Sequence, residues 1–152
     1  MMTRTVLLAG VVFAATLAGV TVGAQPQQAK TAPPAAAHGG MKAVATVKEV
    51  MLAITIPTSE TVFKAASDPP KAAADWDHAR SQALALAESA NLLLMEGRAP
   101  DREAWTTLAV AQREAAMVAV KAIDAKNADA LSNASDALYE TCDNCHNKYM
   151  KK

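Results

Sequence analysis

Aromatic residues, cysteine and net charge are all scarce in this chain. Of its 152 residues, 4% are aromatic and two are cysteines, and the 15 basic residues balance the 15 acidic ones. Balanced charge gives no basic surface of the kind that binds nucleic acid, so we expect no nucleic-acid partner. Both cysteines belong to one short motif near the C-terminus, which leaves none for a disulfide framework.

Glycine and strand-like alternation are rare after residue 40. The region Met41–Lys152 is rich in alanine and contains one glycine, Gly97. Such a composition favours closely packed helices, and no alternation of apolar and polar residues indicates a strand. By its length, the region predicts one small all-α domain.

The first 24 residues predict export. Arg4 is the only charged residue there, an apolar run extends from Val6 to Val22, and small residues precede a cleavage point after Ala24. The alternative is an uncleaved membrane anchor, because the run is close to spanning length. Its glycines and alanines weaken that alternative, so we predict a cleaved signal peptide (1–24) and a periplasmic protein. The chain would be attached to a membrane only if this segment were retained.

The next segment, residues 25–40, is predicted to be a flexible linker. Proline, glutamine, alanine and glycine dominate it, and no large apolar residue is present. Such a segment cannot bury enough surface to offset the cost of ordering. His38 lies in this linker, where we expect a solvated side chain rather than a ligand.

Proline, glycine and polar residues divide the remaining chain into four predicted helices. The first three cover about 41–66, from 71 or 75 to 96, and about 100–125, and the fourth follows a short turn at 126–129. Pro57 should kink the first helix or stop it at Ile56, with a restart capped by Thr58 or Ser59. Short connections favour an antiparallel, up-down-up-down four-helix bundle.

Each predicted helix has one apolar stripe that should face the core. The stripes, in chain order, are Val44, Val47, Met51 and Ile54; Trp76, Ala79, Ala83, Leu86, Ala90 and Leu93; Trp105, Leu108, Ala115 and Val118 or Ala119; and Leu131, Ala134, Leu138, Cys142, Cys145 and Tyr149.

The run from Cys142 to His146 reads C-D-N-C-H, which is the C-x-x-C-H attachment sequence of a c-type haem. The two thiols form thioether bonds with the haem vinyl groups, and the imidazole binds the iron axially. Cys142, Cys145 and His146 share one helix face because they stand at i, i+3 and i+4. We therefore expect one covalently attached haem c.

Two other interpretations of the motif fit less well. A redox C-x-x-C follows a strand and starts a helix, whereas no β-α-β pattern is present here. A structural zinc site requires four ligands, usually in two pairs, and the remaining histidines, His38 and His78, show no such pairing.

The predicted topology places the haem where the fourth helix ends. The first and third helices begin at that end, and the second helix ends there. Residues expected near the haem are Val44, Val47, Lys48, Met51, Leu94, Met95, Trp105 and Leu108, whereas Trp76, His78 and Met117 belong to the far end.

Met51 is the candidate for the second axial ligand. It lies on the inner stripe of the first helix, and a thioether opposite a histidine is a common electron-transfer pair. The alternative is an ordinary core methionine that fills an irregular gap. One turn earlier, Lys48 either pairs with a haem propionate or is solvated. Trp105 and Leu108 are expected to wall the haem edge.

Together these features resemble the class II c-type cytochromes, the family that includes cytochrome c′ and its low-spin relatives. Members are four-helix bundles with C-x-x-C-H near the C-terminus, and the resemblance covers Met41–Lys152. Tyr149 matches an aromatic residue that the family has three positions after the histidine, whereas Met150 replaces its usual basic residue. The resemblance implies that the motif cysteines anchor the haem, that the motif histidine is the proximal ligand, and that a first-helix residue covers the distal face.

The resemblance implies one of two functions. In low-spin members a distal methionine binds the iron, and Met51 occupies the corresponding part of the first helix. In high-spin members the distal residue does not bind, carbon monoxide or nitric oxide enters, and an arginine commonly precedes that residue by one turn. Here that neighbourhood is Val47 and Lys48. We predict a His/Met-ligated one-electron carrier, with a five-coordinate gas-binding protein as the alternative.

Redox proteins are the partners expected of such a carrier. Bundles of this family often pair through helix faces, so a homodimer is compatible with the resemblance. An enzyme such as a peroxidase would need a distal histidine or arginine. Arg98 and Arg102 fall in the predicted turn between the second and third helices, so we predict a protein that is not an enzyme.

Overall fold

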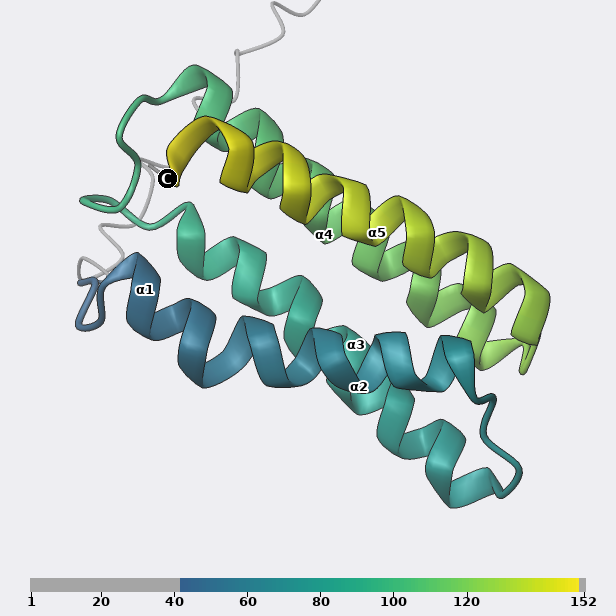
Figure 1. Ribbon diagram of the computed structural model, residues 1–152. Coiled ribbons are helices and arrows are strands. Elements are labelled where there is room, and N and C mark those ends of the chain that lie inside the picture. Colours follow the sequence, from purple (N-terminus) through teal and green to yellow (C-terminus); the bar gives the residue numbers. More distant parts are fainter. Residues whose placement is uncertain (1–41, 151–152) are drawn as a thin grey trace, which may run out of the picture. The chain divides into compact units, whose positions relative to one another are not determined.

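The computed structural model describes residues 42–150, which belong to one compact unit. These residues form four helices (Figure 1), and this part of the chain contains no β-strand. The predicted signal peptide, the linker with His38, and Met41 lie outside the described residues. Within residues 42–150, no helix is long and apolar enough to cross a membrane.

The first helix combines three segments that form one continuous ribbon in Figure 1: α1 (Val47–Val50), a π-helical turn η1 (Met51–Thr55) and α2 (Ile56–Ser67). Thr46 caps its start. The Thr46 hydroxyl accepts a hydrogen bond from the Glu49 N–H at 3.3 Å, and the Glu49 carboxylate accepts one from the Thr46 N–H at 2.7 Å.

This capping box starts the helix later than predicted. Residues 42–46 precede the helix, and Val44 among them is 95% exposed. The prediction that Val44 lies on the inner stripe is therefore wrong, because the residue is not part of any helix.

Pro57 neither stops nor restarts the first helix. Instead, the turn before it is widened, and the Ile56 N–H donates to the Met51 carbonyl five residues earlier. Proline has no N–H, and its ring clashes with the carbonyl four residues back in a regular helix, so a wider turn accommodates it. The predicted stop at Ile56 is wrong, and the irregularity takes the form of a π-turn.

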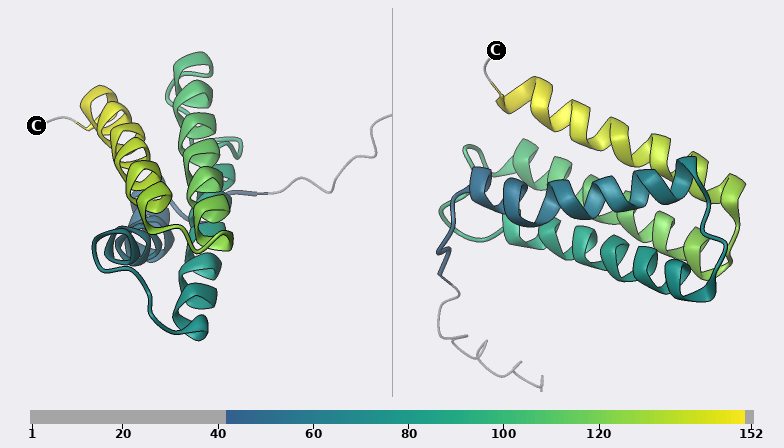
Figure 2. Two further views of the ribbon diagram at one scale, coloured as in Figure 1. Left: turned by 90° about the vertical axis from the view of Figure 1, so that its right-hand side faces the viewer. Right: turned by 60° about the horizontal axis from the view of Figure 1, so that its bottom comes forward.

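Three regular helices follow, with bounds close to those predicted. They are α3 (Ala73–Leu93), α4 (Glu103–Asp124) and α5 (Ala128–Tyr149). The connection between α3 and α4 contains Gly97, whose φ of 88° lies in the left-handed region that glycine adopts readily. Figure 2 shows the four helices lying side by side.

The helices bury their stripes in two apolar clusters. The larger cluster joins α2, α3, α4 and α5, and includes every predicted residue of the second stripe except Ala90 and Leu93, which are also buried. The smaller cluster consists of Val50, Leu93, Trp105 and Ala109. In the third stripe Ala119 is buried, whereas Val118 is 51% exposed and cannot belong to the core.

Side-chain hydrogen bonds join the helix ends near the smaller cluster. The Tyr149 hydroxyl, at the end of α5, donates to the Asp101 carboxylate just before α4 at 2.6 Å. The Trp105 indole N–H donates to the Leu93 carbonyl at 2.7 Å, which links α4 to the end of α3. The Arg98 guanidinium donates to the Ala45 carbonyl, before α1, at 2.9 Å. The first of these bonds holds the end of α5, just after the C-x-x-C-H motif.

Candidate functional site

A groove of about 180 Å³ opens between the first helix and α5. One wall comes from η1 and α2, the other comes from α5, and α4 contributes one polar residue. The lining residues are Met51, Thr55, Ile56, Ser59 and Phe63 on the first wall, Tyr139, Cys142, Asp143, Cys145 and His146 on the second, and Gln112 from α4.

The three chemical groups of the motif line this groove together. Cys142, Cys145 and His146 lie near the end of α5, a regular helix, so their spacing directs them to one side. Both cysteines are free thiols and half-buried, and His146 is exposed. The groove therefore contains two sulfur nucleophiles three residues apart and an adjacent imidazole.

The two thiols are not activated. Burial raises the pKa of the Cys142 thiol, and burial together with the negative charge of the Cys142 thiolate raises that of Cys145. Because the thiolate is the reactive form, a catalytic dithiol has a lowered pKa and usually lies at a helix N-terminus. Here the thiol pKa values are raised, and the motif lies near the C-terminal end of α5. Both properties are the reverse of those of a redox C-x-x-C.

Met51 lies on the wall of the groove formed by the first helix. Its side chain is half-buried and packs against the small cluster that contains Val50 and Leu93. The thioether thus belongs to the same groove as the motif, across from α5. The structure brings together all four residues that the sequence predicted to anchor haem or bind its iron.

The other residues that were expected near the haem lie outside the lining of the groove. Lys48 is exposed, and Val47 packs against the small cluster. The Met95 sulfur accepts a hydrogen bond from the Arg98 guanidinium at 3.2 Å, in the connection that follows α3.

Trp105 and Leu108 also lie away from the lining. Trp105 is buried, and its ring contacts that of Tyr149 edge to face with 5.0 Å between centroids. Leu108 is half-buried on α4. Trp105 therefore supports the end of α5 through its contact with Tyr149.

A set of buried polar side chains beside the motif was not predicted from the sequence. The Thr55 hydroxyl donates to the Ser89 hydroxyl at 3.1 Å, and Ser89 donates to the Leu86 carbonyl at 2.7 Å. The Gln112 amide N–H reaches the Ser89 hydroxyl at 3.5 Å. The sequence of the first helix contained a usable signal: Thr55, Ser59 and Val62 share one face, and two of the three are polar.

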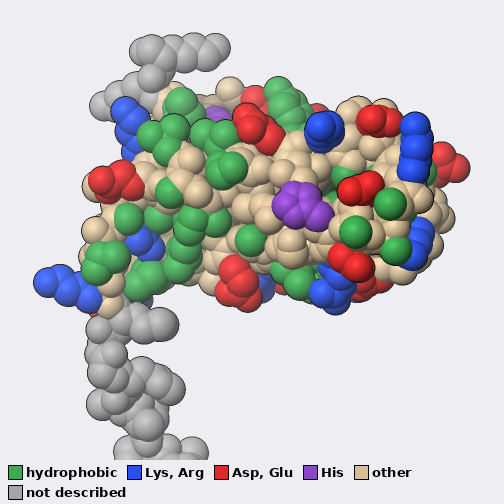
Figure 3. Space-filling view, turned by 90° about the horizontal axis from the view of Figure 1, so that it is seen from below, with side chains coloured by type: hydrophobic (Ala, Val, Ile, Leu, Met, Phe, Trp, Pro, Cys, Tyr) green, Lys and Arg blue, Asp and Glu red, His purple; other side chains and the backbone are tan. Residues whose placement is uncertain are grey.

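The rim of the groove is apolar and partly exposed. Phe63 and Tyr139 meet edge to face across it, with 6.3 Å between ring centroids. Ile56 and Tyr139 both keep large exposed surfaces. In Figure 3, hydrophobic side chains gather toward the end of the molecule where the first helix begins, with charged side chains interspersed.

These residues fit haem c in chemistry. Two free thiols at the required spacing, an imidazole beside them and a thioether across the groove are the donors that a covalently bound haem uses. The groove is smaller than ligand pockets of roughly 300–1,000 Å³. A porphyrin held there must therefore extend over the apolar rim or spread the two helices.

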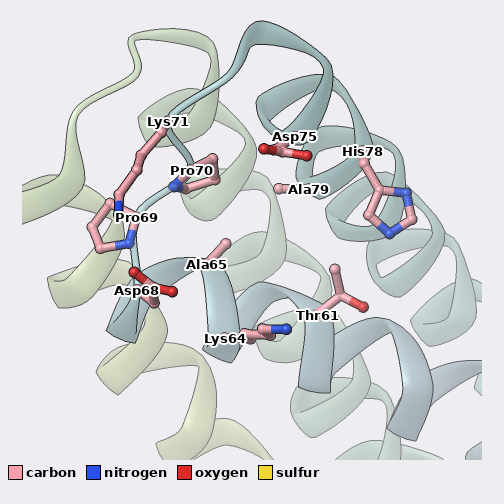
Figure 4. Close-up of a pocket in the computed structure, with 10 residues that line it drawn as sticks. All are labelled: Thr61, Lys64, Ala65, Asp68, Pro69, Pro70, Lys71, Asp75, His78 and Ala79. Atoms are coloured by element: carbon pink, nitrogen blue, oxygen red, sulfur yellow. The ribbon is translucent and has the colours of Figure 1, made fainter.

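A second cavity, of about 440 Å³, lies between the end of α2 and the start of α3 (Figure 4). Ala65 and Ala79 are its buried residues, and His78 lines it together with side chains of both charges, among them Lys64 and Asp75. His78 is thus placed in a cavity that shares no lining residue with the groove. Within residues 42–150, no group of three or more His, Cys, Asp or Glu side chains is arranged to hold a metal ion.

None of the protein-family models, curated proteins or solved structures with which the chain was compared matches it. The functional assignment therefore depends on the groove and on the chemistry of its lining.

Proposed function

We propose that this chain is a c-type cytochrome that carries one covalently attached haem and transfers single electrons between redox proteins. The observation that supports this most is the groove in which both thiols, His146 and Met51 meet. The resemblance of the motif and helix order to class II c-type cytochromes supports the same function. The contacts that join the helix ends also favour the antiparallel, up-down-up-down bundle of that family.

Four of the groove residues have distinct roles in the proposed function. Cys142 and Cys145 add across the two vinyl double bonds, so that each sulfur bonds to one carbon and its hydrogen goes to the other. His146 would bind the iron from α5, and the Met51 thioether would bind it from the first helix. The bound haem supplies the one-electron change between Fe(III) and Fe(II).

The surroundings of the groove suit electron transfer more than substrate chemistry. The lining contains one carboxylate, that of Asp143, and no lysine or arginine, and a methionine ligand favours a raised reduction potential. The exposed His146 leaves this side of the site accessible to a redox partner. We assign no enzymatic role to these side chains.

The predicted signal peptide at residues 1–24 supports a periplasmic location, where the partners would be other redox proteins. The balanced charge of the chain gives no strong electrostatic steering toward any partner. A homodimer remains compatible with the resemblance, and membrane attachment would require the signal segment to be retained.

The experiment is to express the full chain in a host that attaches haem c and to record its mass and its absorption spectrum. We expect one haem per chain that survives acid–organic extraction, and a low-spin spectrum with a methionine–iron band. A high-spin reduced form that takes up carbon monoxide readily would contradict the electron-carrier function and favour the gas-binding alternative. A chain with no covalent haem would contradict both functions.

A further inference from the structure

The π-turn at η1 decides which side chain of the first helix reaches the groove. From the last residue of this turn onward, the buried residues lie on one helix face: Thr55, Thr58, Ser59, Val62 and Ala65. We extend that helix backward at about 100° per residue. A regular helix would then put Met51 at the centre of the buried face and Leu52 on the groove side, in line with Ser59 and Phe63.

The structure has a different arrangement. Val50 is 3% exposed and lies in the core, Met51 lines the groove, and Leu52 is 59% exposed. A π-turn contains one residue more than an α-turn, so the helix before it is rotated by about 100° relative to the helix after it. This rotation accounts for all three positions: it turns Val50 inward, Met51 to the groove and Leu52 to solvent.

Identified side chains hold the π-turn. Pro57 cannot complete a regular turn, because it has no N–H and its ring would clash with the Ala53 carbonyl. The Thr58 hydroxyl donates to the carbonyls of Ile54 and Thr55 at 2.7 and 3.1 Å. Such bonds from a threonine to the carbonyls of the preceding turn compete with the regular backbone pattern and favour an irregular or bent helix.

We propose that Pro57 and Thr58 are positioning residues, which hold the π-turn and thereby direct Met51, rather than Leu52, into the groove. The helix-register part of this proposal requires no haem. The iron-ligation part rests on the proposed function: a thioether can bind iron and a leucine side chain cannot. The register of one helix therefore decides whether the sixth iron position is filled.

A deletion tests the register without haem. Removing Ala53 and changing Pro57→Ala eliminates the extra residue and the proline that goes with it, so the helix becomes regular while both halves keep their faces. We expect a urea midpoint equal to or above that of the unaltered chain. The control deletes Ala111, another exposed alanine, from regular α4, which turns half of that helix away from the core and sharply lowers the midpoint. If both deletions lowered the urea midpoint by the same amount, the proposal would be overturned.

A substitution pair tests the two positioning residues in the haem-loaded protein. Pro57→Ala with Thr58→Val keeps the chain length but frees the helix to become regular, so the methionine–iron band should weaken and a high-spin fraction should appear. Adding Leu52→Met should restore the band, because residue 52 faces the groove in a regular helix. An unchanged spectrum in the Pro57/Thr58 variant would refute the positioning roles. Absence of the band in the unaltered chain would instead refute Met51 ligation and leave the deletion test valid.

Discussion

At the residue scale, Met51 and the C-x-x-C-H side chains reach the groove from different kinds of backbone. Cys142 and His146 project from a regular helix, where spacing alone directs them to one face. Met51 projects from a π-turn, so its direction depends on Pro57 and on the burial of Val50. The directions of the motif side chains are therefore fixed by the local helix, whereas the direction of the methionine depends on packing between helices.

Replacing Met51 by leucine should separate iron ligation from packing. The two side chains are close in volume, so we expect a stability cost below about 1.5 kcal/mol. The thioether is lost, and the reduced haem protein should become high-spin and bind carbon monoxide, as read by absorption spectroscopy. Leu52→Met is the control, because that residue points to solvent and should leave the spectrum unchanged. If Met51→Leu kept the methionine band, another residue, such as Met95, would have to be the ligand.

The hydrogen bond between Tyr149 and Asp101 should make stability depend on pH at both extremes. Burial and the Asp101 carboxylate raise the pKa of Tyr149 to about 12, from 10.0. The hydrogen bond from Tyr149 in turn lowers the pKa of Asp101 below 3.8. The stabilisation from Tyr149 is complete below pH 10 and disappears as the pH rises through about 12. That from Asp101 is present above pH 3.8 and is lost as the pH falls through its lowered pKa.

Urea denaturation as a function of pH measures this effect. In the unaltered chain, the midpoint should fall at both limits beyond what general acid or alkaline denaturation produces. Tyr149→Phe keeps the ring against Trp105 but removes the hydroxyl, so its midpoint should be lower at neutral pH and should converge with that of the unaltered chain above pH 12. A constant difference across the whole range would show that the hydrogen bond carries no pH dependence.

At the scale of elements, α5 is attached to the bundle by its buried apolar side chains rather than by the motif. Leu131, Ala134 and Leu138 are buried in the large cluster, whereas the motif that follows them is half-buried or exposed. Because alanine lines much of the facing surface, the few large side chains account for a large share of the buried area.

Leu138→Ala should therefore destabilise the fold by about 2–5 kcal/mol, because it removes fully buried methyl groups and leaves a cavity. Urea denaturation followed by circular dichroism measures the change. Val118→Ala, on the exposed side of α4, is the control and should change stability by no more than about 0.5 kcal/mol. Similar effects at both positions would mean that α5 is not held by this contact.

The sequence predicts α3 better than it predicts the first helix, and particular residues show why. The stripe from Trp76 to Leu93 is buried as predicted, because α3 is regular and its period is undisturbed. The first helix was only partly predictable. A period of 3.6 residues assumes a regular helix, so one extra residue at η1 moves Val50 into the core, where the pattern had placed Met51.

At the scale of the whole molecule, the core and the groove are largely separate. The large cluster packs all four helices. Among the described hydrophobic residues that line the groove, Phe63 packs against this cluster and Met51 packs against the smaller one. The fold is therefore expected to form without a bound group, and the site is an addition at one side of a packed bundle.

Changing both motif cysteines to alanine tests that separation. The variant Cys142→Ala/Cys145→Ala should lose the covalent haem, so that acid–organic extraction removes all colour. Because neither cysteine belongs to the buried clusters, its helical circular dichroism should match that of the unaltered chain before haem attachment. Colour that resisted extraction would contradict the attachment role, and loss of helicity would show that the motif supports the fold.

The candidate site could be predicted as far as its chemistry is local. The C-x-x-C-H spacing alone identified three groove residues. The predicted lining of Val47, Lys48, Met95, Trp105 and Leu108 came from position along each helix, and the structure places none of them in the groove. The polar residues Thr55, Ser59 and Gln112 line it instead, and only contacts between distant helices bring them there.

The ties on either side of the motif have a consequence for how the protein matures. Phe63 and Tyr139 join α2 to α5 before the motif, and Tyr149 and Asp101 fasten α5 after it. In the closed fold, the thiols between these ties are half-buried and protonated. On the proposed function, the enzymes that join haem to the chain must therefore act on a newly exported polypeptide whose last helix has not yet docked. Closure of α5 would then be the final step of biogenesis.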